Sequence, residues 1–325
     1  MTKFNALPAF TKEEEARAKV YLATQVAAMM GRKLEEGDWS TVYCRAKGIP
    51  DAGWSNLHID VNYAGLGVEH KTLRCSQLGA RSLKIACGTT MMHPSATRSI
   101  RIDDVEGDAD DVMRDVFQQY SELIALRTDR VRQQAGGREP DMRIGWLLWE
   151  DNLTEFLYFE ERMVAPDPSR YYAEWNVTAA RGARKPSRSL WVYDRDTHQK
   201  RYSVTTSAGI KIQPYFDVPP PADPNLYYFR VQGEPVGDGL VQMWVAASTA
   251  IALRRQLGSL EQESVSAAIV TLIEQGVSPD MPAATGEDLA VGVVVSSRAY
   301  SMLTTAWEAV SDEHRAQLLL KALQQ

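Results

Sequence analysis

The apolar residues near the N-terminus recur at the spacing of an amphipathic helix. They lie three or four positions apart, at Val20, Ala23, Ala27 and Met30. Thr11 precedes this series, and Glu14 stands three positions after Thr11, which is the capping box that begins many helices. The pattern therefore predicts a helix over residues 12–30.

Further along, apolar and polar residues alternate one by one in two short stretches, NLHIDVN and GVEHKTLR. Strict alternation is typical of strands with one buried face. We interpret residues 57–73 as an antiparallel hairpin that turns at Ala64 and Gly65. In that register residue 60 pairs with residue 69, and such partners project to the same side, about 5 Å apart.

The remaining pattern predicts one more long helix, then strands, then helices. An acidic start, a helical apolar series and an Arg-rich end predict a helix over residues 108–134. Segment 40–49 fits either a helix or a strand. Strand-like runs fill residues 143–232, and the residues after them favour helix. We expect a main part, residues 1–232, and a helical C-terminal part, residues 233–325, packed together because no long flexible linker separates them.

Composition and charge narrow the function only in part. The 325 residues are 44% hydrophobic and 24% charged, as in an ordinary soluble protein, and the net charge is −6. Nucleic-acid binding would thus require a local basic patch. The three cysteines form no CxxC pair, so we expect reduced thiols in a cytoplasmic protein and no zinc site. Without a signal-peptide pattern, or a run near the roughly 18 apolar residues of a spanning helix, we expect no membrane association.

The predicted hairpin places three charged side chains on one face: Asp60, Glu69 and Lys71. Two carboxylates this close repel each other unless a cation lies between them. Oxygen ligands at this spacing suit Mg²⁺, which keeps several waters and accepts a phosphate oxygen. A neighbouring lysine orients the attacking water and offsets negative charge in the transition state. The alternative is a solvated hairpin whose Glu-Lys alternation is incidental.

Asp60 followed by Glu69-His70-Lys71 in a glycine-containing hairpin resembles the signature of the PD-(D/E)XK nucleases, which include many Type II restriction endonucleases. The resemblance implies an α/β fold with a mixed central sheet flanked by helices. It also implies a Mg²⁺-dependent, site-specific endonuclease that cleaves double-stranded DNA, with Asp60, Glu69 and Lys71 catalytic. The metal ligands would be Asp60, Glu69 and the main-chain carbonyl of His70.

The chain departs from this family pattern around the first acid. Over residues 10–165 the resemblance concerns only the order of helices and strands. The motif residues themselves are confined to the hairpin. Ile59 stands where the family has proline, whereas a literal Pro50-Asp51 lies upstream, so Asp51 is the alternative first acid. We favour Asp60 because it lies inside the alternating strand. The family often has a further acid on its first helix, for which the candidates are Glu14, Glu15 and Glu36.

Two segments carry candidate DNA-binding side chains. A polar segment after the hairpin holds His93 and Arg98, which in a nuclease would lie near the scissile strand and its phosphates. The most basic segment lies between two predicted strands and contains Arg181, Arg184, Lys185 and Arg188. A flexible basic loop of this kind suits insertion into a DNA groove. The alternatives are a capped surface loop and a solvated hairpin tip.

We expect a homodimer, because a two-fold protein places one site on each strand of a duplex. We predict that part of the dimer interface is formed by Val293, Val294, Val295, Leu303 and Trp307. The alternative is that these residues belong to the core of a single chain. The resemblance to restriction enzymes also implies a partner, a cognate DNA methyltransferase in the same restriction system. Two other functions stay open: a repair or phage-defence nuclease without a fixed site, and a noncatalytic DNA-binding or assembly protein. The sequence holds no Walker, GxGxxG or GxSxG motif.

Overall fold

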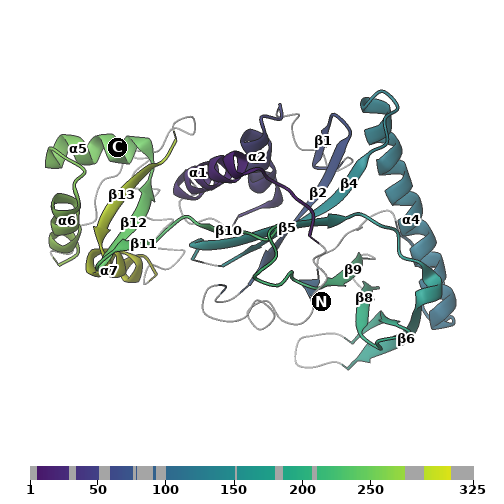
Figure 1. Cartoon of the computed structure of the whole chain (residues 1–325). Helices are drawn as coiled ribbons and strands as arrows, with labels where there is room; N and C mark the ends of the chain where they lie inside the picture. The colour runs from purple at the N-terminus through teal and green to yellow at the C-terminus, as the bar shows by residue number, and fades with distance from the viewer. Residues whose placement is uncertain are drawn as a thin grey trace, which may run out of the picture.

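The computed structural model describes most of the chain. The described residues are 6–28, 34–50, 59–75, 78, 91–92, 100–150, 152–179, 186–206, 211–274 and 289–308. They form three sheets and the helices that cover them, so the chain is a mixed α/β protein (Figure 1). None of the helices in these residues is long and apolar enough to cross a membrane.

The first sheet is mixed and has five strands. They are β1 (Val61–Tyr63), β2 (Leu66–Arg74), β4 (Asp141–Trp149), β5 (Glu155–Arg162) and β10 (Tyr227–Arg230), in the order β1-β2-β4-β5-β10. β2 and β4 are parallel, whereas the other neighbours are antiparallel. A parallel pair needs a long crossover, and here the chain passes through a helix between β2 and β4.

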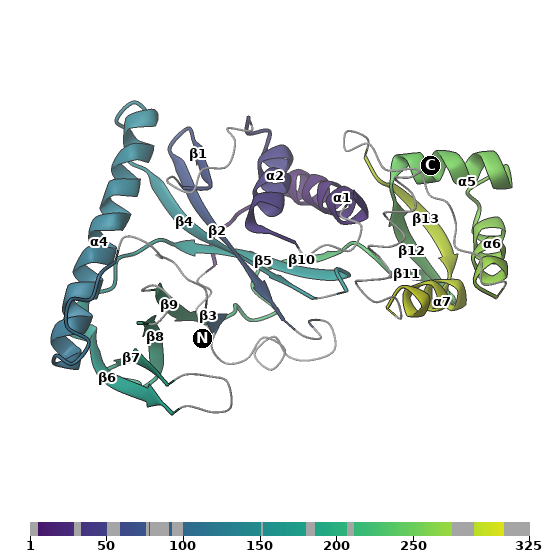
Figure 2. The same cartoon turned by 180° about the vertical axis from the view of Figure 1, so that it is seen from behind.

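Two helices cover one face of this sheet, and a third reaches its other side. α1 (Lys12–Ala28) begins with the predicted capping box, in which Thr11 and Glu14 exchange hydrogen bonds of 2.8 and 3.2 Å. α2 (Glu36–Lys47) packs beside α1, and its Trp39 and Tyr43 are fully buried. α4 (Ala109–Gln134) extends from β1 of the first sheet to β6 of the second (Figures 1 and 2).

The second sheet is antiparallel and lies against the face of the first sheet that α1 and α2 leave free. It is built in the order β3-β9-β8-β7-β6 from β3 (Met91–Met92), β6 (Tyr171–Thr178), β7 (Ser187–Asp194), β8 (Lys200–Thr205) and β9 (Lys211–Phe216), with the 3-10 turn η1 (Pro168–Arg170) before β6. Trp146 of β4 stacks on Phe216 of β9, with ring centroids 3.9 Å apart. This buried contact joins the two sheets.

The C-terminal part forms a third, smaller layer beyond α1 (Figure 1). Its elements are β11 (Glu234–Gly237), β12 (Leu240–Val245), α5 (Ala247–Leu257), α6 (Gln262–Glu274), β13 (Val291–Ser296) and α7 (Ser297–Glu308), with the three strands antiparallel. Lys19 of α1 binds Glu234 across this junction at 2.6 Å. α6 and α7 pack on this sheet, so the C-terminal part is not a helical bundle.

Most predicted elements are confirmed, and one prediction is wrong. The predicted helices form as Lys12–Ala28 and Ala109–Gln134, and the hairpin at 57–73 and the strands within 143–232 form as well; residues 29, 30, 57 and 58 lie outside the described part. The undecided segment 40–49 is helical through Lys47.

The prediction of a helical C-terminal part is wrong in part: α5, α6 and α7 form, but β11, β12 and β13 are strands. Val293 and Val295 lie in β13 and are buried against α6 rather than presented on a helix, whereas Val294 is half-buried. Leu303 lies on α7, and the side chain of Trp307 is outside the described residues. β-branched residues favour a sheet once a partner strand is available.

Candidate active site

The predicted hairpin register is present, and it is fixed by its turn. Ala64 and Gly65 both have positive φ, 52° and 93°, as a two-residue hairpin turn requires. Tyr63 then pairs with Leu66, and Val61 with Val68. Continued by one residue, the same register sets Asp60 opposite Glu69.

Asp60 directly precedes β1, beside β2. Its Oδ2 accepts a hydrogen bond of 2.7 Å from the main-chain N–H of His70. Burial, and then the negative charge of Glu69, raise the pKa of Asp60 to about 7. The protein thus holds two carboxylates together, and their mutual repulsion favours either a proton or a cation at this position.

Lys71 connects the acids of this cluster. Its Nζ lies 3.1 Å from Oε1 of Glu69 and 3.2 Å from Oε2 of Glu36. Burial by itself lowers the pKa of Lys71, but the charges of Glu69, Glu36 and then Asp60 outweigh it, so the pKa is raised. Lys71 is therefore a cation in the absence of metal.

Glu36 supplies an acid from a helix that precedes the hairpin. It stands in the first turn of α2, whereas Glu14 and Glu15 stand in the first turn of α1. Glu14 bonds with Thr11 and lies 3.2 Å from Lys47, away from the cluster. Of the three candidates, the structure brings only Glu36 to Lys71.

The sequence did not reveal one member of the cluster, Arg127 of α4. Its Nη1 lies 3.4 Å from Oε2 of Glu69, an oxygen that is buried and has no hydrogen bond. The Arg-rich end of the helix was visible in the sequence, but helical spacing alone does not identify which arginine faces Glu69. Arg127 therefore gives Glu69 a second cationic neighbour beside Lys71.

His70 points to the opposite face of β2, as the alternation predicts. Its Nδ1 lies 2.8 Å from Oγ of Ser40, and its ring packs edge-on against Tyr43 at a centroid distance of 4.9 Å. Complete burial, followed by the charge of Lys71, lowers the pKa of His70 to about 3. The side chain is a neutral core residue, and only its main chain belongs to the site.

The donor set fits a hydrated Mg²⁺ rather than a metal enclosed by protein. Mg²⁺ keeps several waters and is commonly held by one or two carboxylates. Asp60 and Glu69 provide those carboxylates, and Glu69 has an oxygen without a hydrogen bond. Within the described residues, no three acidic, histidine or cysteine side chains are already grouped around a common point.

The predicted DNA-binding residues fall mostly outside the described part of the chain. His93, Arg98, Arg181, Arg184 and Lys185 belong to that remainder, as does the alternative acid Asp51.

Arg188 is described, and two groups already hold its side chain. Its Nη1 lies 2.6 Å from Oε2 of Glu106, and its guanidinium lies 4.4 Å from the centre of the Trp175 ring. A guanidinium paired in this way still presents part of its surface to solvent.

Comparison with known proteins does not assign a family to this chain. No family model, no curated protein and no solved structure matches it. The function must therefore be inferred from the geometry of the cluster formed by Glu36, Asp60, Glu69, Lys71 and Arg127.

Proposed function

We propose that this protein is a Mg²⁺-dependent endonuclease that hydrolyses phosphodiester bonds in double-stranded DNA at specific sites. One observation carries the proposal: the register of β1 and β2, continued by one residue, sets Asp60 opposite Glu69, whose Oε1 lies 3.1 Å from Lys71 Nζ. The pKa of Asp60, which burial and then the charge of Glu69 raise, supports it, because a buried carboxylate beside a second one indicates a place for a cation.

Three groups of the chain would hold the ion: the carboxylates of Asp60 and Glu69 and the main-chain carbonyl of His70. The N–H of His70 points to Asp60, and in an extended strand the N–H and C=O of one residue project to the same edge. The carbonyl therefore faces Asp60 as well. Bound there, Mg²⁺ would supply Lewis-acid activation of the scissile phosphate and of the attacking water.

Lys71 acts as an orienting cation. Its raised pKa keeps it protonated, so it is not a resting-state base. An ammonium at this position holds the attacking water in line and offsets the charge that develops on the phosphate oxygens. Glu36, 3.2 Å away from the other side, positions that ammonium without contacting the substrate.

A noncatalytic DNA-binding or assembly protein is the second candidate. Arg127 and Lys71 favour it, because together they already balance Glu69 without any metal. In that case the cluster would be an internal ion network that orders α4 against β2. A repair or phage-defence nuclease would use the same residues without a fixed recognition site.

Digestion of plasmid and phage DNA separates these functions. We expect cleavage with Mg²⁺ and none with EDTA, and sequencing of the product ends would show whether one sequence recurs. Ends scattered over many sequences would indicate a defence or repair nuclease. Binding with no cleavage under any divalent ion would indicate the noncatalytic protein.

A further inference from the structure

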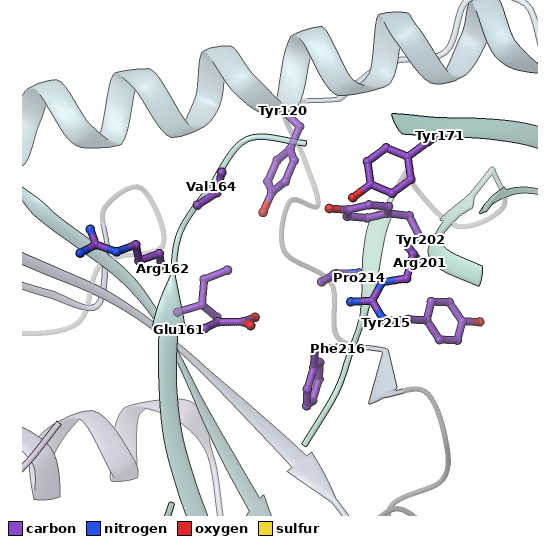
Figure 3. A pocket seen from close by; sticks show the side chains of 11 residues that line it. Tyr120, Glu161, Arg162, Val164, Tyr171, Arg201, Tyr202, Pro214, Tyr215 and Phe216 are labelled. Atoms are coloured by element: carbon purple, nitrogen blue, oxygen red, sulfur yellow. The ribbon is translucent and has the colours of Figure 1, made fainter. Parts of the chain in front are cut away.

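A cavity of about 180 Å³ lies between the two large sheets, beneath α4 (Figure 3). Its lining includes Tyr120 of α4, Ile144 of β4, Glu161 of β5, Arg201 and Tyr202 of β8 and Phe216 of β9. The carboxylate of Glu161 and the hydroxyls of Tyr120 and Tyr202 point into the hollow. The cavity is thus walled by aromatic rings and lined by one acid, Glu161, and two arginines, of which Arg162 turns its guanidinium away from the hollow.

This cavity lies beside the candidate active site. Glu161 pairs with Ile144, and Ile144 pairs with Glu69, so the three side chains form one row on the same face of the sheet. Two strand spacings separate the ends of that row, about 10 Å. Tyr120 and Arg127 are seven residues apart on α4, which is also about 10 Å along a helix, so α4 covers both places.

The polar groups of the cavity are held in place by neighbours. Oε1 of Glu161 accepts a hydrogen bond of 2.9 Å from Nε1 of Trp146, which leaves the other oxygen for a ligand. Nη1 of Arg201 lies 3.0 Å from Oδ2 of Asp217, so its guanidinium keeps further donors available. Phe216 is fixed by its stack on Trp146. An acceptor, a donor and a flat wall therefore converge on one small space.

These features suit a planar heterocycle that carries an amino group. An apolar cavity of about 150 Å³ holds one benzene ring, so a volume near 180 Å³ accommodates a single six-membered ring. A carboxylate accepts from the exocyclic amino group of cytosine, and aromatic side chains stack on bases that have left a duplex. Glu161 would repel a free phosphate, and Arg201 would repel a quaternary ammonium.

We propose that this cavity binds one unstacked cytosine base, whose amino group donates to Glu161 and whose ring packs on Phe216. The inference rests on the proposed function, because it takes the base from the DNA strand that is cleaved at Asp60 and Glu69. A separation of about 10 Å corresponds to roughly three steps of 3.4 Å along one strand. The base thus comes from a nucleotide within about three steps of the cleaved phosphate.

Single-stranded oligonucleotides test the cavity directly, since their bases leave no duplex stack. We would measure the affinity of the full chain for oligo-dC and oligo-dT, with Ca²⁺ present to prevent cleavage. The wild type should prefer dC by on the order of tenfold, the effect expected of one charge-assisted hydrogen bond. Equal affinities for dC and dT would overturn the inference.

Glu161→Gln is the diagnostic variant. Trp146 Nε1 is only a donor, so it holds the amide oxygen and turns the amide NH₂ into the cavity. An NH₂ repels the amino group of cytosine and donates to the carbonyl of thymine, so the preference should reverse toward dT. Glu174→Gln, an exposed change on β6, is the matched control and should keep the dC preference. An unchanged ratio in Glu161→Gln contradicts the proposal.

A second variant and a second readout keep the two proposals separate. Arg201→Gln should weaken dC binding several-fold without reversing the preference, and it alters a side chain that is 30% exposed and so safe for folding. Cleavage with Mg²⁺ is measured on the same preparations. Base preference that depends on Glu161 without any cleavage supports the cavity and refutes the nuclease. Cleavage that depends on Lys71, together with a dC preference that Glu161→Gln leaves unchanged, refutes the cytosine cavity and leaves the proposed nuclease in place.

Discussion

Burial and the negative charge of Glu69 both disfavour the ionised form of Asp60. Because Asp60 has a pKa of about 7 in the folded state and 3.8 when unfolded, the folded chain binds more protons between these pH values. Folding stability contributed by this group therefore falls as pH rises through that window, by at most about 1.4 kcal/mol per pH unit. His70, with a lowered pKa, contributes a slope of opposite sign between pH 3 and 6.5.

Asp60→Asn isolates the effect of Asp60, since His70 is common to both proteins. Asparagine keeps an acceptor for the N–H of His70 but has no charge to lose. Without metal, we expect the variant to gain stability relative to the wild type as pH increases from 4 to 7, measured by urea unfolding. At pH 8, Mg²⁺ should raise the Tm of the wild type and leave that of Asp60→Asn nearly unchanged. A stability difference between variant and wild type that does not change with pH, together with no change of the wild-type Tm on adding Mg²⁺, would argue against a cation site.

His70→Ala should affect stability much more than rate. The substitution removes a fully buried ring and its bond with Ser40, at a cost of about 2 kcal/mol or more, but it keeps the main-chain carbonyl. We expect a lower urea midpoint and near wild-type turnover per folded molecule. Loss of turnover in a fully folded variant would show that the ring itself takes part in the reaction.

The sequence identified the three residues of the cluster that share one hairpin, left Glu36 as one of three candidate acids, and missed Arg127. Asp60, Glu69 and Lys71 are related by strand alternation and one turn, both of which are local. Arg127 and Glu36 reach the site from helices, and one sequence does not define which face of a helix meets a given strand. Only the packed structure brings them together.

Among the elements, strands joined by a tight turn were predictable and strands joined over long distances were not. The register of β1 and β2 follows from period two and a turn at Ala64. β12 and β13 pair across about fifty residues, and their segments run directly into α5 and α7. In a single sequence, the apolar residues of those short strands cannot be distinguished from the helical series that directly follows them.

The basic segment between β6 and β7 is expected to contact DNA. Replacing Arg184 and Lys185 by alanine should weaken binding and flatten its dependence on salt, because fewer counterions are released. The logarithm of affinity against the logarithm of salt concentration gives the slope, which should decrease by about one unit per lost phosphate contact. Arg188→Ala is a useful comparison, since it also removes the pair with Glu106. An unchanged slope in the double variant would leave the segment as a solvated turn.

At the scale of the whole molecule, the mixed α/β architecture was predictable, but the cavity was not. Helical and strand-like segments follow each other in a clear order along the chain. The cavity depends on how the second sheet lies against β5 and α4, and its lining extends from Tyr120 to Phe216. Nothing local in the sequence connects those residues.

The assembly is expected to be a homodimer, because a two-fold protein places one site on each strand of a duplex. Val293 and Val295 are buried in their own sheet, so they are removed from the predicted interface. Light scattering should give twice the mass of one chain, either alone or on DNA. A mass of one chain in both conditions would contradict the dimer and would require successive nicks by a single site.

The most direct test of the central claim compares cleavage and binding in Glu69→Gln and Lys71→Ala. Glu69→Gln removes a metal ligand with little change of shape, and Lys71→Ala removes the cation that orients water. We expect both variants to lose cleavage by at least about a hundredfold with Mg²⁺, while DNA affinity measured in Ca²⁺ stays near that of the wild type. Cleavage that survives in both variants would show that the reaction takes place elsewhere in the molecule.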